Sequence, residues 1–75
     1  MNKIRDKKLL ISFGNHLRHL RKQNNLSLEA LANEADVEIS QIYRIEKGLI
    51  NPTLSTLKIL ANALNIPLPE LMDFK

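Results

Sequence analysis

Apolar residues recur at every third or fourth position through most of this chain, which is the spacing of one face of an α-helix. The first such stretch runs from about Asp6 to Asn24, with leucine or phenylalanine at positions 10, 13, 17 and 20. Gly14 lies inside it, at a cost of about 1 kcal/mol relative to Ala, and would allow a neighbouring helix to approach closely. The pattern predicts a first helix that ends at Asn24-Asn25.

A second and a third short helix follow, separated by a tight turn. Ser27 has the hydroxyl of an N-cap residue, and residues 28–35 carry an apolar stripe made of Leu28, Leu31, Ala32 and Ala35. Asp36 is predicted to occupy the turn with left-handed backbone angles, and Val37 is predicted to be buried. The third helix is expected over residues 38–47, with Gly48 as its C-terminal cap.

The third helix has two different faces. Isoleucines at positions 39, 42 and 45 form an apolar row, of which Ile42 and Ile45 point inward on a helical wheel. The opposite face carries Ser40, Tyr43, Arg44 and Lys47, and Gln41 and Ile39 lie at its flanks. This short helix therefore presents a hydroxyl, a phenol and two cations to solvent.

The rest of the chain predicts two more helices and no strand. Thr53 is the expected N-cap of a fourth helix, which ends at Asn65; its inward residues are Leu54, Leu57, Leu60, Ala61 and Leu64. Pro69 lies in the first turn of a short fifth helix over residues 69–72. β-branched residues never alternate over four or more positions. The predicted fold is all-α: a single domain over residues 1–75, built as a compact five-helix bundle with a central helix-turn-helix.

Composition narrows the class of protein. Hydrophobic residues make up 44% of the chain and charged residues 25%, as in ordinary globular domains. There is no Cys, which excludes a disulfide, a thiolate zinc site and a cysteine nucleophile. No apolar run approaches the roughly 20 residues that span a bilayer, and the start lacks the features of a signal peptide. A cytoplasmic protein without a membrane partner is expected.

The charge is unevenly distributed along the chain. Residues 1–25 hold seven Lys or Arg residues (Lys3, Arg5, Lys7, Lys8, Arg18, Arg21 and Lys22) and one Asp, a formal charge of +6. Residues 26–75 carry a formal charge of −3. A basic segment suits a polyanionic partner. A solvated helix face explains the same pattern, and it is the preferred interpretation for the N-terminal cations.

Four fragments, in order and at characteristic spacing, carry a family resemblance: LSLEALA, IYRIEKG, NPTLSTLKILANALNI and PELM. With them the chain resembles the helix-turn-helix domains of the phage repressor/Cro type, often called Xre-like, from about Phe13 to Leu71. Residues 1–12 would extend the first helix. The resemblance implies a five-helix DNA-binding domain that dimerises on pseudo-palindromic operators, with residues 38–47 as the recognition helix.

The resemblance also assigns roles to individual residues. It implies base contacts by Ile39, Ser40 and Arg44, and a structural pair between Arg21 and Glu46. The chain departs from the family pattern at two positions. Leu28 stands where the family usually has a Gln that anchors a phosphate, and Asp36 stands where it often has Gly.

The chemistry of the outward side chains agrees with these roles. Arg can grip O6 and N7 of guanine with two donors, Ser can serve either type of base, and Ile39 could meet a thymine methyl. Contacts to the DNA backbone are predicted for five residues with polar or cationic side chains: Ser27, Gln41, Tyr43, Lys47 and Asn51. For Asn51 a plain turn residue before Pro52 explains the sequence equally well.

The sequence gives little support for a metal site, an enzyme active site or a cofactor site. His16 and His19 are spaced for a metal, but no Cys is available and no carboxylate lies one turn away on that face, so no metal site is predicted. Two glycines cannot build a phosphate-cradling loop, and a chain this small has little room for a substrate pocket. The prediction is that the chain is no enzyme and has no cofactor and no small-molecule effector.

The sequence thus predicts a sequence-specific transcriptional regulator that binds double-stranded DNA as a homodimer. Dimerisation is expected through the C-terminal region, which has more apolar side chains than one short helix can bury: Leu64, Ile66, Leu68, Leu71, Met72 and Phe74. Three alternatives stay open. The chain could be a restriction–modification controller protein, an antitoxin, or a protein-interaction module that reuses the fold.

Overall fold

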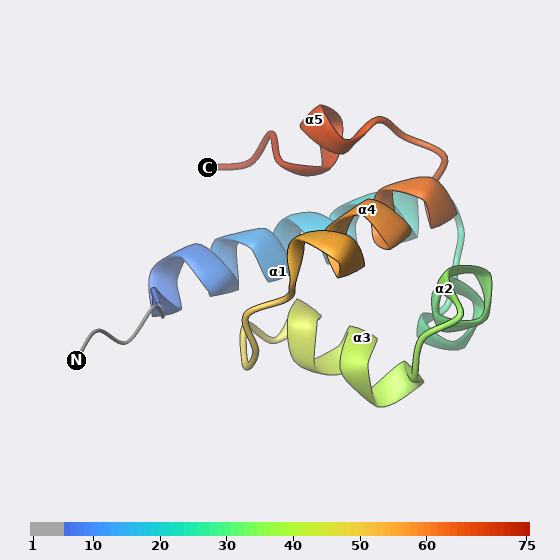
Figure 1. The fold of residues 1–75 in the computed structure, drawn as a ribbon, viewed down its shortest axis with the longest axis horizontal. Coiled ribbons are helices and arrows are strands. Elements are labelled where there is room, and N and C mark those ends of the chain that lie inside the picture. Colours follow the sequence, from blue (N-terminus) through green and yellow to red (C-terminus); the bar gives the residue numbers. More distant parts are fainter. Residues whose placement is uncertain (1–5) are drawn as a thin grey trace.

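The computed structural model describes residues 6–75, which form five helices and no strand (Figure 1). The helices are α1 (Lys7–Gln23), α2 (Leu28–Ala35), α3 (Ile39–Glu46), α4 (Leu54–Ala63) and α5 (Leu68–Leu71). α3 packs against both α1 and α2, while α4 packs against α2 and α5. The all-α, five-helix prediction is confirmed. Lys3 and Arg5, two of the cations in the basic N-terminal segment, lie outside the described residues.

Three of the five helices, α1, α2 and α4, begin at a residue whose side chain caps the helix. The carboxylate of Asp6 accepts a hydrogen bond from the Leu9 N–H at 3.1 Å. The hydroxyl of Ser27 accepts one from the Ala30 N–H at 3.0 Å, and that of Thr53 accepts one from the Thr56 N–H at 3.1 Å. The predicted caps Ser27 and Thr53 are therefore confirmed. Each satisfies a backbone donor that the first turn of a helix leaves unpaired.

The first four helices end in the same way. Each is followed by one residue with a positive φ: 57° at Asn25, 55° at Asp36, 73° at Gly48 and 59° at Asn65. The next N–H along the chain then bonds back to a carbonyl five residues earlier, as in the 3.0 Å bond from Val37 to Ala32. This is the Schellman motif. The left-handed conformation predicted for Asp36 is confirmed, and Asn65, the predicted end of the fourth helix, adopts it as well.

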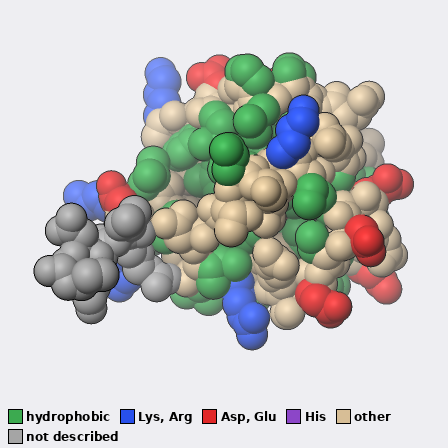
Figure 2. Space-filling model, in the orientation of Figure 1, with side chains coloured by type: hydrophobic (Ala, Val, Ile, Leu, Met, Phe, Trp, Pro, Cys, Tyr) green, Lys and Arg blue, Asp and Glu red, His purple; other side chains and the backbone are tan. Residues whose placement is uncertain are grey.

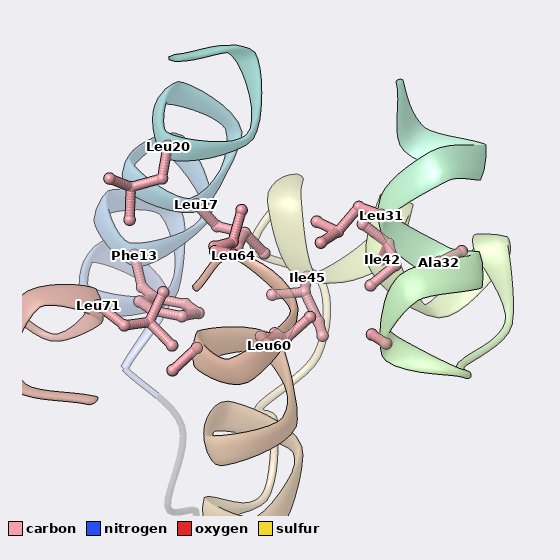
Figure 3. Close-up of a cluster of buried hydrophobic side chains, with 12 residues drawn as sticks. Phe13, Leu17, Leu20, Leu31, Ala32, Ile42, Ile45, Leu60, Leu64 and Leu71 are labelled. Carbon is pink, nitrogen blue, oxygen red and sulfur yellow. The ribbon is translucent and has the colours of Figure 1, made fainter. Parts of the chain in front are cut away.

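The core is aliphatic and draws on all five helices. Figure 3 shows Phe13 and Leu17 of α1 lying close to Leu64, the residue directly after α4, and to Leu71 of α5. The buried cluster consists of Phe13, Leu17, Leu20, Leu31, Ala32, Ala35, Ile42, Ile45, Leu60, Ala61, Leu64 and Leu71. Val37 packs against this cluster but is only partly buried. Among residues 6–75, no helix has both the length and the hydropathy needed to cross a bilayer.

Leu54 does not face inward as predicted. Its side chain is 72% exposed, although Leu60 and Ala61 of the same helix and Leu64 directly after it are buried. Leu54 lies about 70° from the centre of the arc that the other four apolar residues define. It is also the first residue of α4, where no element that packs against the inner face covers it. The prediction was wrong because a helical period locates an arc but does not show how far neighbouring elements extend over it.

The C-terminal segment is tied to α1 by two rings. The Phe74 ring meets Phe13 edge-on at a centroid distance of 5.5 Å and stacks on His16 at 5.9 Å. The Nε2 of His16 also lies 3.2 Å from the carbonyl oxygen of Glu70. His16 thus packs and hydrogen-bonds within the fold. Within the described part of the chain, no three His, Asp or Glu side chains gather as metal ligands would.

Candidate nucleic-acid interface

The outward face of α3 is formed by the side chains that the helical wheel selected. Ile42 and Ile45 are buried in the core, which orients the helix. Tyr43 and Ile39 are about half exposed, at 48% and 47%, and three further side chains on this face are exposed: Ser40, Arg44 and Lys47. α3 lies at the edge of the molecule (Figure 1), and its outward side chains are mainly polar or cationic.

Two of these side chains interact with each other. The Nζ of Lys47 lies 5.7 Å from the centroid of the Tyr43 ring, within the range of a cation–π contact. Within residues 6–75, the guanidinium of Arg44 takes part in no hydrogen bond or ion pair. Its donors are thus available to a ligand that approaches α3 from outside.

Arg21 and Glu46 hold α3 against α1. The Nε of Arg21 donates to Oε2 of Glu46 at 2.6 Å, and an Nη donates to Oε1 at 3.0 Å, so the pair is bidentate. A third guanidinium bond reaches the carbonyl oxygen of Leu26 at 2.9 Å. Both residues are buried, at 7% and 8% exposure. The hydrogen bond to the Glu46 carboxylate, aided by its negative charge, raises the pKa of Arg21 above its ordinary value, so the guanidinium stays charged.

Two glycines allow this close approach of helices. A Cβ at Gly14 would lie 2.4 Å from the carbonyl oxygen of Glu46 and 2.5 Å from that of Ile45. The closely packed neighbour that Gly14 indicated is therefore the end of α3. Gly48 has a φ of 73°, and a Cβ there would lie 2.8–2.9 Å from atoms of Ile11 on α1. The absence of a Cβ at these two positions allows the C-terminal end of α3 and α1 to lie directly against each other.

The residues predicted to contact a DNA backbone come from the start of α2, from α3 and from the loop after α3. Ser27 is exposed at the start of α2, where its hydroxyl also caps the helix. Gln41 is half buried at the edge of α3, and Asn51 is exposed in the loop between α3 and α4. Leu28, beside Ser27, is partly buried against the core and presents no polar group. The predicted positions thus lie at the start of α2, along α3 and in the loop that follows α3.

The residues around the two ends of α3 carry opposite charges. A shallow hollow of about 590 Å³ beside its N-terminal end is lined by Glu29, Asp36 and Glu38 and by no cation. Figure 2 shows acidic side chains gathered over α2 and the start of α3 on the visible face. A groove beside the C-terminal half of α3 contains Arg18 and Lys22 of α1 together with Lys47. The sequence could not show that these α1 cations lie next to the polar face of α3.

α2 and α3 are two short helices joined by a turn with one left-handed residue, and α3 exposes a polar face. This arrangement defines a helix-turn-helix protein. A family model described as "Helix-turn-helix" matches residues 17–71. The chain belongs to this family.

Similar proteins include regulators of transcription. The HTH-type transcriptional repressor RghR of Bacillus subtilis is 44% identical over 62 residues, which are 81% of this chain and 46% of that protein. Control protein C.SmaI of Serratia marcescens is 44% identical over 57 residues, 76% of this chain and 68% of that protein. The chain therefore spans less than half the length of the repressor and about two thirds of the control protein.

A solved structure is similar over nearly its whole length. The restriction-modification controller protein C.AhdI from Aeromonas hydrophila superposes with a TM-score of 0.81 at 39% sequence identity. The match covers 83% of this chain and 94% of that one. The order and packing of the helices are thus similar to those of C.AhdI.

Proposed function

We propose that this chain is a sequence-specific, DNA-binding transcriptional regulator that acts on a pseudo-palindromic operator as a homodimer. The outward face of α3 carries the proposal, because it exposes Ser40, Arg44 and Lys47 on a helix that the buried Arg21–Glu46 pair fixes in place. A rigid helix about 10–12 Å wide with its side chains fits the major groove of B-DNA. The family membership of the chain supports this role.

Three side chains of α3 are proposed to contact bases. Arg44 has free donors that match O6 and N7 of guanine, and Ser40 lies one turn earlier on the same exposed face. Ile39 is half exposed at the start of the helix, where its methyl groups could contact the methyl of thymine. These contacts would supply the preference for one sequence.

Five other residues are proposed to contact the DNA backbone and so to position α3: Ser27, Gln41, Tyr43, Lys47 and Asn51. Hydroxyl, amide and ammonium groups are the usual donors to phosphate oxygens. The cation–π contact places the Lys47 ammonium over the Tyr43 ring at the rim of the exposed face. Such contacts raise affinity for every sequence alike.

Dimerisation is proposed through the C-terminal region and the elements beside it. Within the predicted apolar set, Leu64 and Leu71 are buried in the protomer core, whereas Met72 is 41% exposed. Met72 and Phe74 line an apolar groove together with Leu9, Leu10, Phe13, Pro52 and Leu57. Figure 2 shows hydrophobic side chains gathered in this upper part of the visible face. A second copy of the chain would cover them and place two α3 helices one DNA turn, about 34 Å, apart.

Sedimentation tests the dimer. At a protein concentration of tens of micromolar, with and without DNA, we expect a dimer that Met72→Glu weakens, because a carboxylate would be buried in an apolar interface. Strictly monomeric protein under both conditions would contradict the proposed assembly.

A comparison of Arg44 with Lys47 tests the role of α3. After selection of a preferred site from random DNA, Arg44→Ala should weaken binding to that site by about 1–3 kcal/mol and relax the choice of one base. Lys47→Ala should weaken binding to preferred and random DNA alike and lower the salt slope by about one unit. Lys75→Ala, at the C-terminal end of the chain, serves as the control for loss of one positive charge.

The alternatives give different results in the same experiment. A protein-interaction module would show no preferred sequence at about physiological salt, and Arg44→Ala would then behave as wild type. Within DNA binding, the near-complete superposition on C.AhdI favours a controller-type regulator. That hypothesis predicts a preferred site upstream of restriction–modification genes, whereas an antitoxin would bind upstream of its own toxin gene.

A further inference from the structure

The groove between α1 and α3 is positively charged and lies beside the polar face of α3. Its volume is about 340 Å³, and four cations line it: Arg18, Arg21, Lys22 and Lys47. Glu46 is the one carboxylate in its lining, and the bidentate bond to Arg21 neutralises it. Within residues 6–75, the other three cations form no ion pair with a carboxylate. The groove thus has an excess of three positive charges.

The groove meets the polar face of α3 along its C-terminal half. Tyr43 and Lys47 of α3 form one wall, and Asn15, Arg18 and Lys22 of α1 form the other. Positions 15, 18 and 22 are three and four residues apart, so they lie in one row on α1. Leu28 of α2 also lines the groove and offers no hydrogen-bond donor from its side chain, so the donors here come from α1 and α3.

We propose that this groove binds the phosphate backbone of the duplex that α3 enters, with Arg18 and Lys22 as phosphate contacts. The inference rests on the proposed function. The major groove of B-DNA is about 12 Å wide, so a helix inside it has a phosphate backbone close on either side. The side with Arg18 and Lys22 attracts that backbone, and the hollow lined by Glu29, Asp36 and Glu38 repels it.

The charge difference also determines how the duplex is held. DNA carries one negative charge per roughly 1.7 Å of its axis, and each phosphate that a cation neutralises adds to the salt dependence of binding. Because the cations of the groove lie on the α1 side of α3, the strand on that side contributes most of the salt-dependent affinity. Because Arg18 and Lys22 contact phosphates and not bases, they raise the affinity for every DNA sequence equally. Choice of sequence stays with the side chains at the exposed centre of α3.

The test compares salt slopes. The double variant Arg18→Ala/Lys22→Ala, the charge-retaining variant Arg18→Lys/Lys22→Arg and the control Lys75→Ala are titrated with the selected site and with a scrambled duplex of equal length. Loss of two phosphate contacts should lower the slope of log K against log salt by about 1.8. Between about 50 and 200 mM salt, the affinity of the double variant should then fall about 12-fold less than that of wild type.

Several results distinguish the possible explanations. We expect the double variant to lose affinity equally for both duplexes, the charge-retaining variant to keep the wild-type slope, and Lys75→Ala to leave the slope unchanged. The inference is overturned if the double variant keeps the wild-type slope, or if the charge-retaining variant loses as much as the alanine variant. If wild type itself binds no DNA in a salt-dependent way, the proposed function fails as well.

Discussion

The Arg21–Glu46 pair should be the most sensitive polar contact of the fold. We consider three variants, Arg21→Met, Glu46→Leu and the double substitution, which exchange the charges for apolar side chains of comparable length. In wild type the guanidinium donates three hydrogen bonds, two to the carboxylate and one to the Leu26 carbonyl. Each single variant leaves one buried charge without its ionic partner.

The burial of the pair determines how much stability each variant should lose. Removing one partner of a buried pair costs about 3–5 kcal/mol, because the remaining charge stays desolvated. A domain of 75 residues has a total free energy of unfolding of roughly 4–11 kcal/mol, so either single variant should lose a large part of its stability. The double variant leaves no charge behind and should lose only about 1 kcal/mol, for the hydrogen bond to the Leu26 carbonyl. The coupling between the two positions should then exceed about 2 kcal/mol.

Urea unfolding followed by circular dichroism measures these differences. All variants must be compared at one protein concentration, since dimerisation makes stability depend on concentration. Glu34→Leu removes an exposed carboxylate of α2 and should change stability by no more than about 0.5 kcal/mol. A coupling energy below about 0.5 kcal/mol would refute the account of α3 as a helix held in place by this pair.

Three further substitutions test other parts of the fold by the same unfolding measurement. Gly14→Ala should destabilise by about 1–3 kcal/mol, because the added Cβ would meet backbone oxygens of α3; a gain of about 1 kcal/mol, as at an open helical site, would contradict this packing. Leu60→Ala should cost about 2–5 kcal/mol and Leu54→Ala less than about 0.5 kcal/mol in the monomer, and equal losses would contradict the exposure of Leu54. At Asp36, where φ is 55°, Gly should be more stable than Ala by about 1 kcal/mol, the reverse of the order in a helix; Ala as the more stable residue would refute the left-handed turn.

The sequence alone determined the helices and most of their ends, because these depend on local interactions. Leu10, Phe13, Leu17 and Leu20 repeat at helical spacing and are buried. Ser27 and Thr53 cap the helices that follow them, and Asp36, Gly48 and Asn65 adopt the left-handed angles that end a helix. The outward face of α3 was equally predictable, since two buried isoleucines orient the whole helix.

Tertiary structure decided what no local pattern contains, namely which faces have a neighbour. Leu54 shares the apolar character of the buried residues of α4, yet it remains exposed because no other element extends over the first turn. Arg18 and Lys22 have the spacing of an ordinary solvated face, and only the packing of α1 against α3 places them beside Lys47. The spacing of His16 and His19 gave no role for His16, and only the packing of the C-terminal segment places the Phe74 ring against it. Periodicity specifies the direction in which a side chain points, whereas the long-range packing of helices determines what it meets there.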